Sequence, residues 1–157
     1  MRACKGFDIR EDDLSGDQAR ELIVLHLKGM HANSPPGSVF ALDLSGLKDP
    51  SVTVWSAWRG EKIASIGALK MLGRDQAEVK SMRTHPDFLR KGAAAQLLEY
   101  IINGARERAV RVLSLETGSG DAFEPALALY RRRGFVRGEP FGGYIASAFN
   151  QYFHLRL

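Results

Sequence analysis

Apolar residues recur with the spacing of an α helix in three separate parts of the chain. The three stretches are residues 18–30, 94–105 and 123–133. Apolar positions three and four apart fall on one helix face, which is the pattern of a helix packed against a core. Gly134 follows the third stretch, where a helix C-terminus favours glycine. We therefore expect three amphipathic helices.

Three stretches between the first two helices are rich in β-branched and aromatic residues, which predicts strands. They are residues 51–58, 63–72 and 77–84. Polar turn residues join them at 59–62 and at 73–76. Short turns of this kind connect antiparallel neighbours, so the pattern predicts an antiparallel meander.

Shorter segments complete the predicted order of elements. We expect a strand at residues 2–10, a short helix or turn at 38–47, and strands at 110–116, 135–137 and 149–157. A strand, a helix and a second strand in succession form a right-handed crossover with the two strands parallel. The chain is thus predicted to form one α/β domain over residues 1–157, with a mixed sheet.

A basic loop of small residues leads into the second helix. Arg90 and Lys91 precede Gly92, and alanines occupy positions 93–95. A helix start exposes unpaired backbone N–H groups and the positive end of the helix dipole. Small side chains let an anion approach these groups. The loop is therefore predicted to bind a phosphate or pyrophosphate.

The charge of the chain is only slightly basic. The net charge of +4 arises from 22 basic and 18 acidic residues, and part of the excess lies in Arg90, Lys91 and Arg131–Arg133. A solvated helix face and a phosphate-binding loop explain this excess better than nucleic-acid binding. Cys4 is the single cysteine, so a disulfide framework is excluded and a nucleophilic role is not favoured. No apolar run approaches the roughly 18 residues of a membrane span, which favours a cytoplasmic protein.

Two motifs then point to a family. Residues 89–94 resemble the Gln/Arg-x-x-Gly-x-Gly/Ala loop of the GNAT acetyltransferases, and residues 126–135 match the family's Ala-x-x-Leu-Tyr-x-x-x-Gly-Phe pattern at every fixed position. Leu89 departs where the family has Gln or Arg, and Phe123 departs where asparagine is common. The resemblance implies the GNAT fold, in which the meander feeds the crossover and the two parallel strands splay apart.

The resemblance implies acetyl-coenzyme A as co-substrate and no metal. In the family, amides of the loop hold the pyrophosphate, and the pantetheine arm enters between the splayed strands and pairs with the first of them. The residues that would bind acetyl-coenzyme A are Met82, Arg83, Thr84, Arg90, Lys91, Gly92, Ala93, Ala94 and Ala95. The Met82 N–H would polarise the thioester carbonyl and its developing oxyanion. Arg90 would compensate for the apolar side chain of Leu89, which offers the phosphates no polar group.

Acetyl transfer to an amine needs a neutral amine, a stabilised oxyanion and a proton for the departing thiolate. Tyr130 stands where the family often has its general acid, with a packing role as the alternative. Glu78 is the first candidate for the base, since the family often places a carboxylate on this strand. A solvated carboxylate at a strand end is the alternative for Glu78. Glu116 is the second candidate, and it could instead hold a cationic amine.

The acceptor is predicted to be the amine of a small molecule or a peptide. Asn33, Ser119 and Tyr144 could contact it together with Glu116, and an ordinary loop role is the alternative for each of the three. The aromatic last strand would allow a homodimer to form by strand pairing. The predicted function is direct transfer of acetyl from acetyl-coenzyme A to a primary amine. The alternatives are a catalytically silent acyl-coenzyme A binding module and a nucleic-acid binder, which no recognised motif supports.

Overall fold

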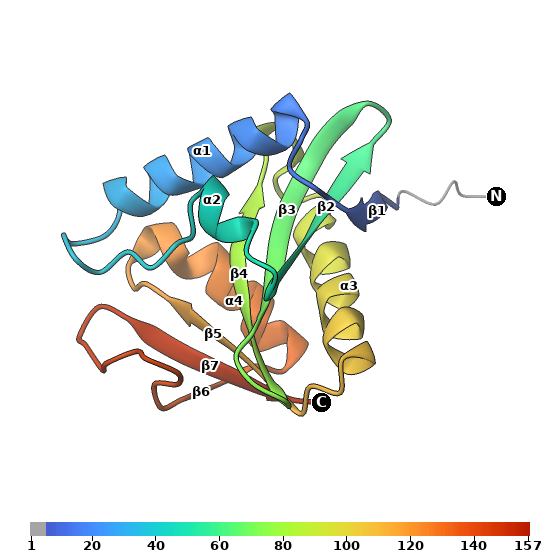
Figure 1. The fold of residues 1–157 in the computed structure, drawn as a ribbon. Helices are drawn as coiled ribbons and strands as arrows, with labels where there is room; N and C mark the ends of the chain where they lie inside the picture. The colour runs from blue at the N-terminus through green and yellow to red at the C-terminus, as the bar shows by residue number, and fades with distance from the viewer. Residues whose placement is uncertain (1–5) are drawn as a thin grey trace.

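A seven-stranded mixed sheet forms the centre of the protein (Figure 1). The computed structural model describes residues 6–157. The strands are β1 (Asp8–Glu11), β2 (Val52–Arg59), β3 (Lys62–Met71), β4 (Gln76–Thr84), β5 (Val112–Thr117), β6 (Val136–Gly138) and β7 (Gln151–Arg156). The helices are α1 (Asp17–Ala32), α2 (Leu44–Leu47), α3 (Ala93–Glu107) and α4 (Glu124–Arg133), with 3₁₀ turns at Pro86–Phe88 and Asp121–Phe123. The predicted α/β fold with a mixed sheet is confirmed.

The strands follow one another across the sheet in the order β1-β2-β3-β4-β5-β7-β6. β2, β3 and β4 pair antiparallel as predicted, and β1 adds to β2 in the same antiparallel sense. Gly60 supplies the positive φ that the tight β2–β3 turn requires. α3 then crosses over so that β5 lies parallel to β4. β5, β7 and β6 continue as an antiparallel set.

The β4–β5 pairing is short. Only three residue pairs are in register, and the last joins Glu78 to Ser114. β4 continues to Thr84 and β5 to Thr117 without further pairing between them. The two central strands therefore separate beyond Glu78, which confirms the predicted splay.

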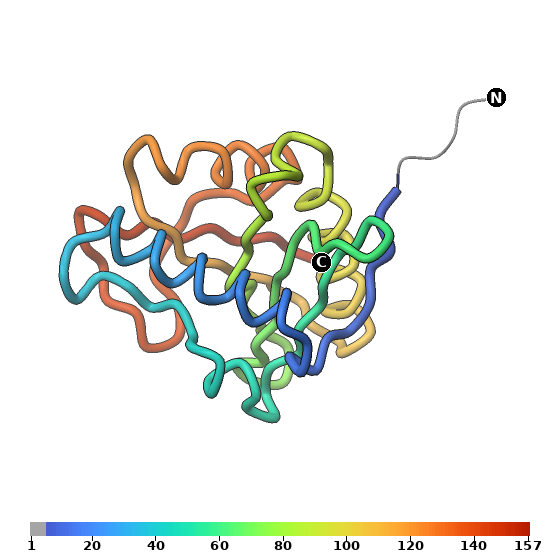
Figure 2. Tube along the Cα trace, turned by 90° about the horizontal axis from the view of Figure 1, so that it is seen from above, coloured from blue at the N-terminus to red at the C-terminus, as the bar shows by residue number. Residues whose placement is uncertain are grey.

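Helices cover both faces of the sheet. α1 and α2 lie on one face, and α3 and α4 on the other (Figures 1 and 2). The larger core lies under α3 and α4, and Ala77 and Val79 of β4 belong to it. Because successive strand residues point to opposite faces, Glu78 and Lys80 point to the α1 side.

The last strand is not at an edge of the sheet. β7 pairs with β5 on one side and with β6 on the other. The prediction that this strand would pair across a homodimer is therefore wrong, because its backbone hydrogen bonds are already used within the chain. The sheet edges of the described residues are β1 and β6.

Other differences from the predicted elements are small. The segment 38–47 is helical only over Leu44–Leu47, where the Asp43 side chain accepts a hydrogen bond from the Gly46 N–H. The first strand is observed at Asp8–Glu11. The other end of the predicted strand, residues 2–5 with Cys4 among them, lies outside the described residues. Among residues 6–157, no helix is both long and apolar enough to cross a membrane.

Candidate active site

A β-bulge interrupts β4 just past the point where β5 leaves it. Lys80 lies opposite Ala68 and Arg83 opposite Ile66, so Ser81 and Met82 together face the single residue Gly67. Ser81 adopts a φ of 58°. A bulge of this kind bends its strand and ends regular pairing. Beyond Glu78, β4 thus turns an unpaired backbone edge to the gap, where an extended ligand could pair with it.

The start of α3 lies where the sequence predicts an anion site. Gly92 is the N-cap residue, with a φ of 86°, and no side chain of residues 6–157 caps the helix. A Cβ added at Gly92 would meet only Gln96 Nε2, at 3.8 Å, so the approach to the first backbone N–H groups is open. Arg90 and Lys91 are exposed beside it. Leu89 is 56% exposed and leaves this backbone geometry undisturbed.

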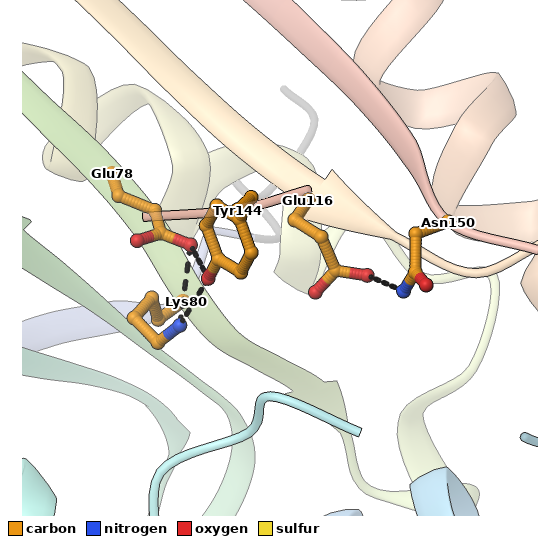
Figure 3. A network of polar contacts seen from close by, with 5 residues as sticks. All are labelled: Glu78, Lys80, Glu116, Tyr144 and Asn150. Carbon is orange, nitrogen blue, oxygen red and sulfur yellow. Dashed lines mark hydrogen bonds and ion pairs between the residues drawn. The ribbon is translucent and has the colours of Figure 1, made fainter. Parts of the chain in front are cut away.

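Three side chains form a buried polar cluster at the last β4–β5 pair (Figure 3). Lys80 Nζ lies 3.2 Å from Glu78 Oε2, and the Tyr144 hydroxyl donates a hydrogen bond to the same oxygen at 2.5 Å. Lys80 Nζ also donates to the Tyr144 oxygen at 3.0 Å. Glu78 is only 3% exposed, so the alternative of a solvated strand-end carboxylate is wrong.

Tyr144 joins the cluster from the loop between β6 and β7. Burial and the nearby negative charge of Glu78 raise the pKa of Tyr144. The hydroxyl therefore stays protonated and donates a hydrogen bond to Glu78. The ring packs edge-on against Phe40 and Phe141, with centroid distances of 5.1 and 5.0 Å. Aromatic packing therefore holds a loop residue beside a strand carboxylate that precedes it by 66 residues.

A second carboxylate lies on the other side of the Tyr144 ring (Figure 3). Glu116 Oε2 accepts a hydrogen bond from Asn150 Nδ2 at 2.7 Å, and Asn150 is itself tied to the Ser38 carbonyl at 3.2 Å. Burial raises the pKa of Glu116, and the Asn150 hydrogen bond opposes part of that rise. Glu116 therefore takes up a proton more readily than an ordinary glutamate.

Three polar residues around these carboxylates were missed by the sequence analysis: Lys80, Asn150 and His154. Lys80 carried a signal, because it lies two residues from Glu78 and shares its strand face. His154 Nε2 donates to the Glu139 carbonyl at 2.8 Å, which leaves Nδ1 to accept from the Ser114 hydroxyl at 2.7 Å. This pair anchors the start of the β6–β7 loop, and no local pattern reveals it.

Tyr130 is a residue of α4 and its side chain belongs to the larger core. It is 6% exposed and packs edge-on against Phe135, at 5.7 Å between centroids. Burial raises the pKa of Tyr130, so the side chain is a protonated phenol. Its hydroxyl makes no hydrogen bond to any of residues 6–157, which leaves the donor available to a ligand.

Asn33 and Ser119 make no hydrogen bond to this cluster. Asn33 follows α1 and donates from Nδ2 to the Gly29 carbonyl at 2.8 Å, which caps the helix. Ser119 is partly exposed and makes no hydrogen bond within residues 6–157. Phe123 packs edge-on against Phe149, at 5.6 Å. Among the described residues, no group of three or more His, Cys, Asp or Glu side chains could hold a metal ion.

Comparisons with known proteins agree with these features. Residues 19–135 match the acetyltransferase (GNAT) family. The chain is 49% identical over 136 residues to the "Uncharacterized N-acetyltransferase YsnE" of Bacillus subtilis, covering 87% of this chain and 90% of the relative. It is 42% identical over 151 residues to the "Uncharacterized N-acetyltransferase YedL" of Escherichia coli, covering 96% and 95%.

A solved structure shows the same fold. It is a GNAT family acetyltransferase from Elizabethkingia anophelis with acetyl-CoA bound, which superposes with a TM-score of 0.70 at 15% identity and covers 98% of this chain and 100% of that one. The family match spans most of the chain, and both bacterial relatives are more than 40% identical to it over most of its length. The chain belongs to the GNAT acetyltransferase family.

Proposed function

We propose that this chain transfers the acetyl group of acetyl-coenzyme A directly to a primary amine. The observation that carries the proposal is the opening between β4 and β5, with an uncapped helix start on one side and two carboxylates on the other. Backbone amides at Gly92–Ala95 would hold the pyrophosphate. The unpaired edge at Met82–Thr84 would pair with the pantetheine arm, and Arg90 and Lys91 would add positive charge at its mouth.

The described side chains divide the chemistry between them. Glu78 or Glu116, directly or through a water, takes a proton from the incoming ammonium, so that a neutral nitrogen can attack the carbonyl carbon. The Met82 N–H stabilises negative charge on the carbonyl oxygen. Tyr130 gives its proton to the sulfur as the carbon–sulfur bond breaks, and the second proton that the attacking nitrogen loses restores the tyrosine. The acetylated amine, free coenzyme A and one proton result.

The two carboxylates suit different parts of this scheme. Glu78 already binds the Lys80 ammonium and the Tyr144 hydroxyl through one oxygen, which favours a role as a fixed negative charge and a proton relay through Tyr144. Glu116 has a raised pKa and one oxygen without a hydrogen bond from residues 6–157. Glu116 is therefore the better proton acceptor, which reverses the order of preference taken from the sequence.

Release of free thiol from acetyl-coenzyme A in the presence of a panel of amines tests this function. We expect amine-dependent thiol release with the acetylated amine as the second product, detected by mass spectrometry. Titration calorimetry measures the binding of acetyl-coenzyme A in parallel. Binding without turnover across the panel would favour a silent acyl-coenzyme A binding module instead.

A further inference from the structure

Arg83 carries a positive charge that no acidic side chain of residues 6–157 pairs. It is half-buried on β4, directly after the bulge. Its Nε donates to His26 Nδ1 at 3.1 Å, and its Nη2 lies 3.5 Å from the His26 carbonyl oxygen. Burial lowers the pKa of Arg83. A charge kept partly out of water with no counter-ion is costly, and an anionic ligand would remove that cost.

His26 does not supply the missing negative charge. Burial, with the positive charges of Arg83 and Lys80, lowers the pKa of His26 to about 3. The ring is therefore neutral near pH 7, with Nδ1 accepting from Arg83 and the proton on Nε2. His26 orients the guanidinium without neutralising it.

The position of Arg83 connects it to the acceptor side of the site. Met82 points towards α3, because a Cβ added at Gly67 would meet both Met82 Sδ and the Ile101 side chain. Arg83 points the other way, towards His26 and Gly29 of α1. Glu78, Lys80 and Arg83 therefore share the α1 face of β4. Glu78 satisfies the charge of Lys80, and only Arg83 is left with an unmatched charge among these three residues.

We propose that the acceptor carries a carboxylate in addition to its amine, and that the Arg83 guanidinium binds this carboxylate. The inference rests on the proposed acetyl transfer and names its acceptor class as an amino acid. A guanidinium presents parallel N–H donors that match the two oxygens of a carboxylate. The ammonium group would then lie towards the Glu116 carboxylate, so that each charged end of the acceptor meets the opposite charge.

Three matched sets of acceptors test the class. The first is a pool of free amino acids, the second is the corresponding amino-acid amides, and the third is the corresponding decarboxylated amines. We expect acetylated products from the first pool and at least tenfold less from the other two, as counted by mass spectrometry. Equal or faster reaction of the amides or amines would overturn the carboxylate inference and leave acetyl transfer intact. Acetyl-coenzyme A binding with no product from any pool would contradict both.

Two variants test the residue. Arg83→Gln removes the charge, and we expect KM for an amino-acid acceptor to rise about tenfold or more. Gly29→Ala keeps Arg83 but places a Cβ 2.9 Å from Arg83 Nη2, so the end of the guanidinium must move. Because alanine favours a helix over glycine, this variant weakens acceptor binding without weakening α1.

The matched control is Lys28→Ala, at an exposed position next to Gly29 on α1. We expect it to leave KM for the acceptor unchanged. All three variants should keep the acetyl-coenzyme A affinity, since the proposed cofactor contacts of Arg83 come from its backbone. If Arg83 only ties β4 to α1, the first two variants will change the melting temperature or kcat and leave KM for the acceptor as it is.

Discussion

The two halves of the candidate site are built in different ways. The cofactor half is one continuous segment, in which the β4 edge, a short loop and the start of α3 present mostly backbone groups. The acceptor half consists of side chains from β4, β5, α1 and the loop before β7. A backbone cradle needs only its geometry, so it keeps its form with an exposed leucine at position 89. A cluster of buried side chains depends on each member.

The largest effect is expected at the start of α3, at Gly92. Gly92→Glu would force a glutamate into a φ of 86° and place a carboxylate beside the backbone N–H groups that are proposed to bind the pyrophosphate. We expect acetyl-coenzyme A binding to fall below detection by titration calorimetry, with the fold retained by circular dichroism. Gly92→Ala is the control: its Cβ would make only an ordinary contact with Gln96 Nε2, so we expect acetyl-coenzyme A binding to be kept, while the left-handed strain lowers the free energy of unfolding by about 1 kcal/mol. Normal binding by Gly92→Glu would remove this loop from the cofactor site.

On the acceptor side, Glu78→Gln should mainly cost stability. It leaves the buried Lys80 ammonium without its counter-charge, and breaking such a pair costs about 3 kcal/mol in the free energy of unfolding. Denaturant titration measures the loss. The double variant Glu78→Gln with Lys80→Met removes both charges and should recover much of it. A single variant as stable as the parent would show that the pair is not energetically coupled.

Tyr130 tests whether chemistry can be separated from cofactor binding. Tyr130→Phe keeps the ring packing on Phe135 and removes only the proton donor. We expect kcat to fall about 100-fold while acetyl-coenzyme A affinity stays nearly the same. Tyr100→Phe, on the exposed face of α3, should have no effect. An unchanged kcat would leave Tyr130 with a packing role alone.

The smallest effect on stability is expected from Glu116, and it depends on pH. The pKa of Glu116 is raised in the folded protein, so the folded state holds its proton above the ordinary value of 4.5. Folding stability attributable to this group is therefore full below pH 4.5 and is lost as pH rises through the raised pKa. Glu116→Gln cannot ionise, so it should melt at a higher temperature than the parent at pH 7 and at a similar temperature near pH 4.

Thermal melts across this pH range measure the difference for Glu116→Gln, with Glu107→Gln at an exposed position of α3 as control. Activity of the same variant tests the proton-acceptor role. A large loss of kcat despite higher stability would support Glu116 as the base. A pH profile of kcat that matches the parent would return that role to Glu78.

Sequence periodicity was informative wherever a structure depends on near neighbours. It located the three main helices, the meander and the crossover, and the small residues at 92–95 correctly marked an uncapped helix start. It failed for β7, whose alternating residues look the same at an edge and in the interior of a sheet. The sheet position of β7 depends on β6, which pairs with it after an intervening loop of twelve residues, 139–150.

The sequence by itself determined the family, the order of elements and the start of α3 after Gly92, because these follow from contiguous motifs and from hydrogen bonds between close neighbours. Only the tertiary structure decided that Glu78 is buried with Lys80, that Tyr144 reaches it, and that Asn150 and His26 hold Glu116 and Arg83. Except for the Glu78–Lys80 pair on one strand, those contacts join residues that are 34 to 66 positions from each other in the sequence. They arise when loops close over the sheet and exclude water, and no local spacing encodes that step.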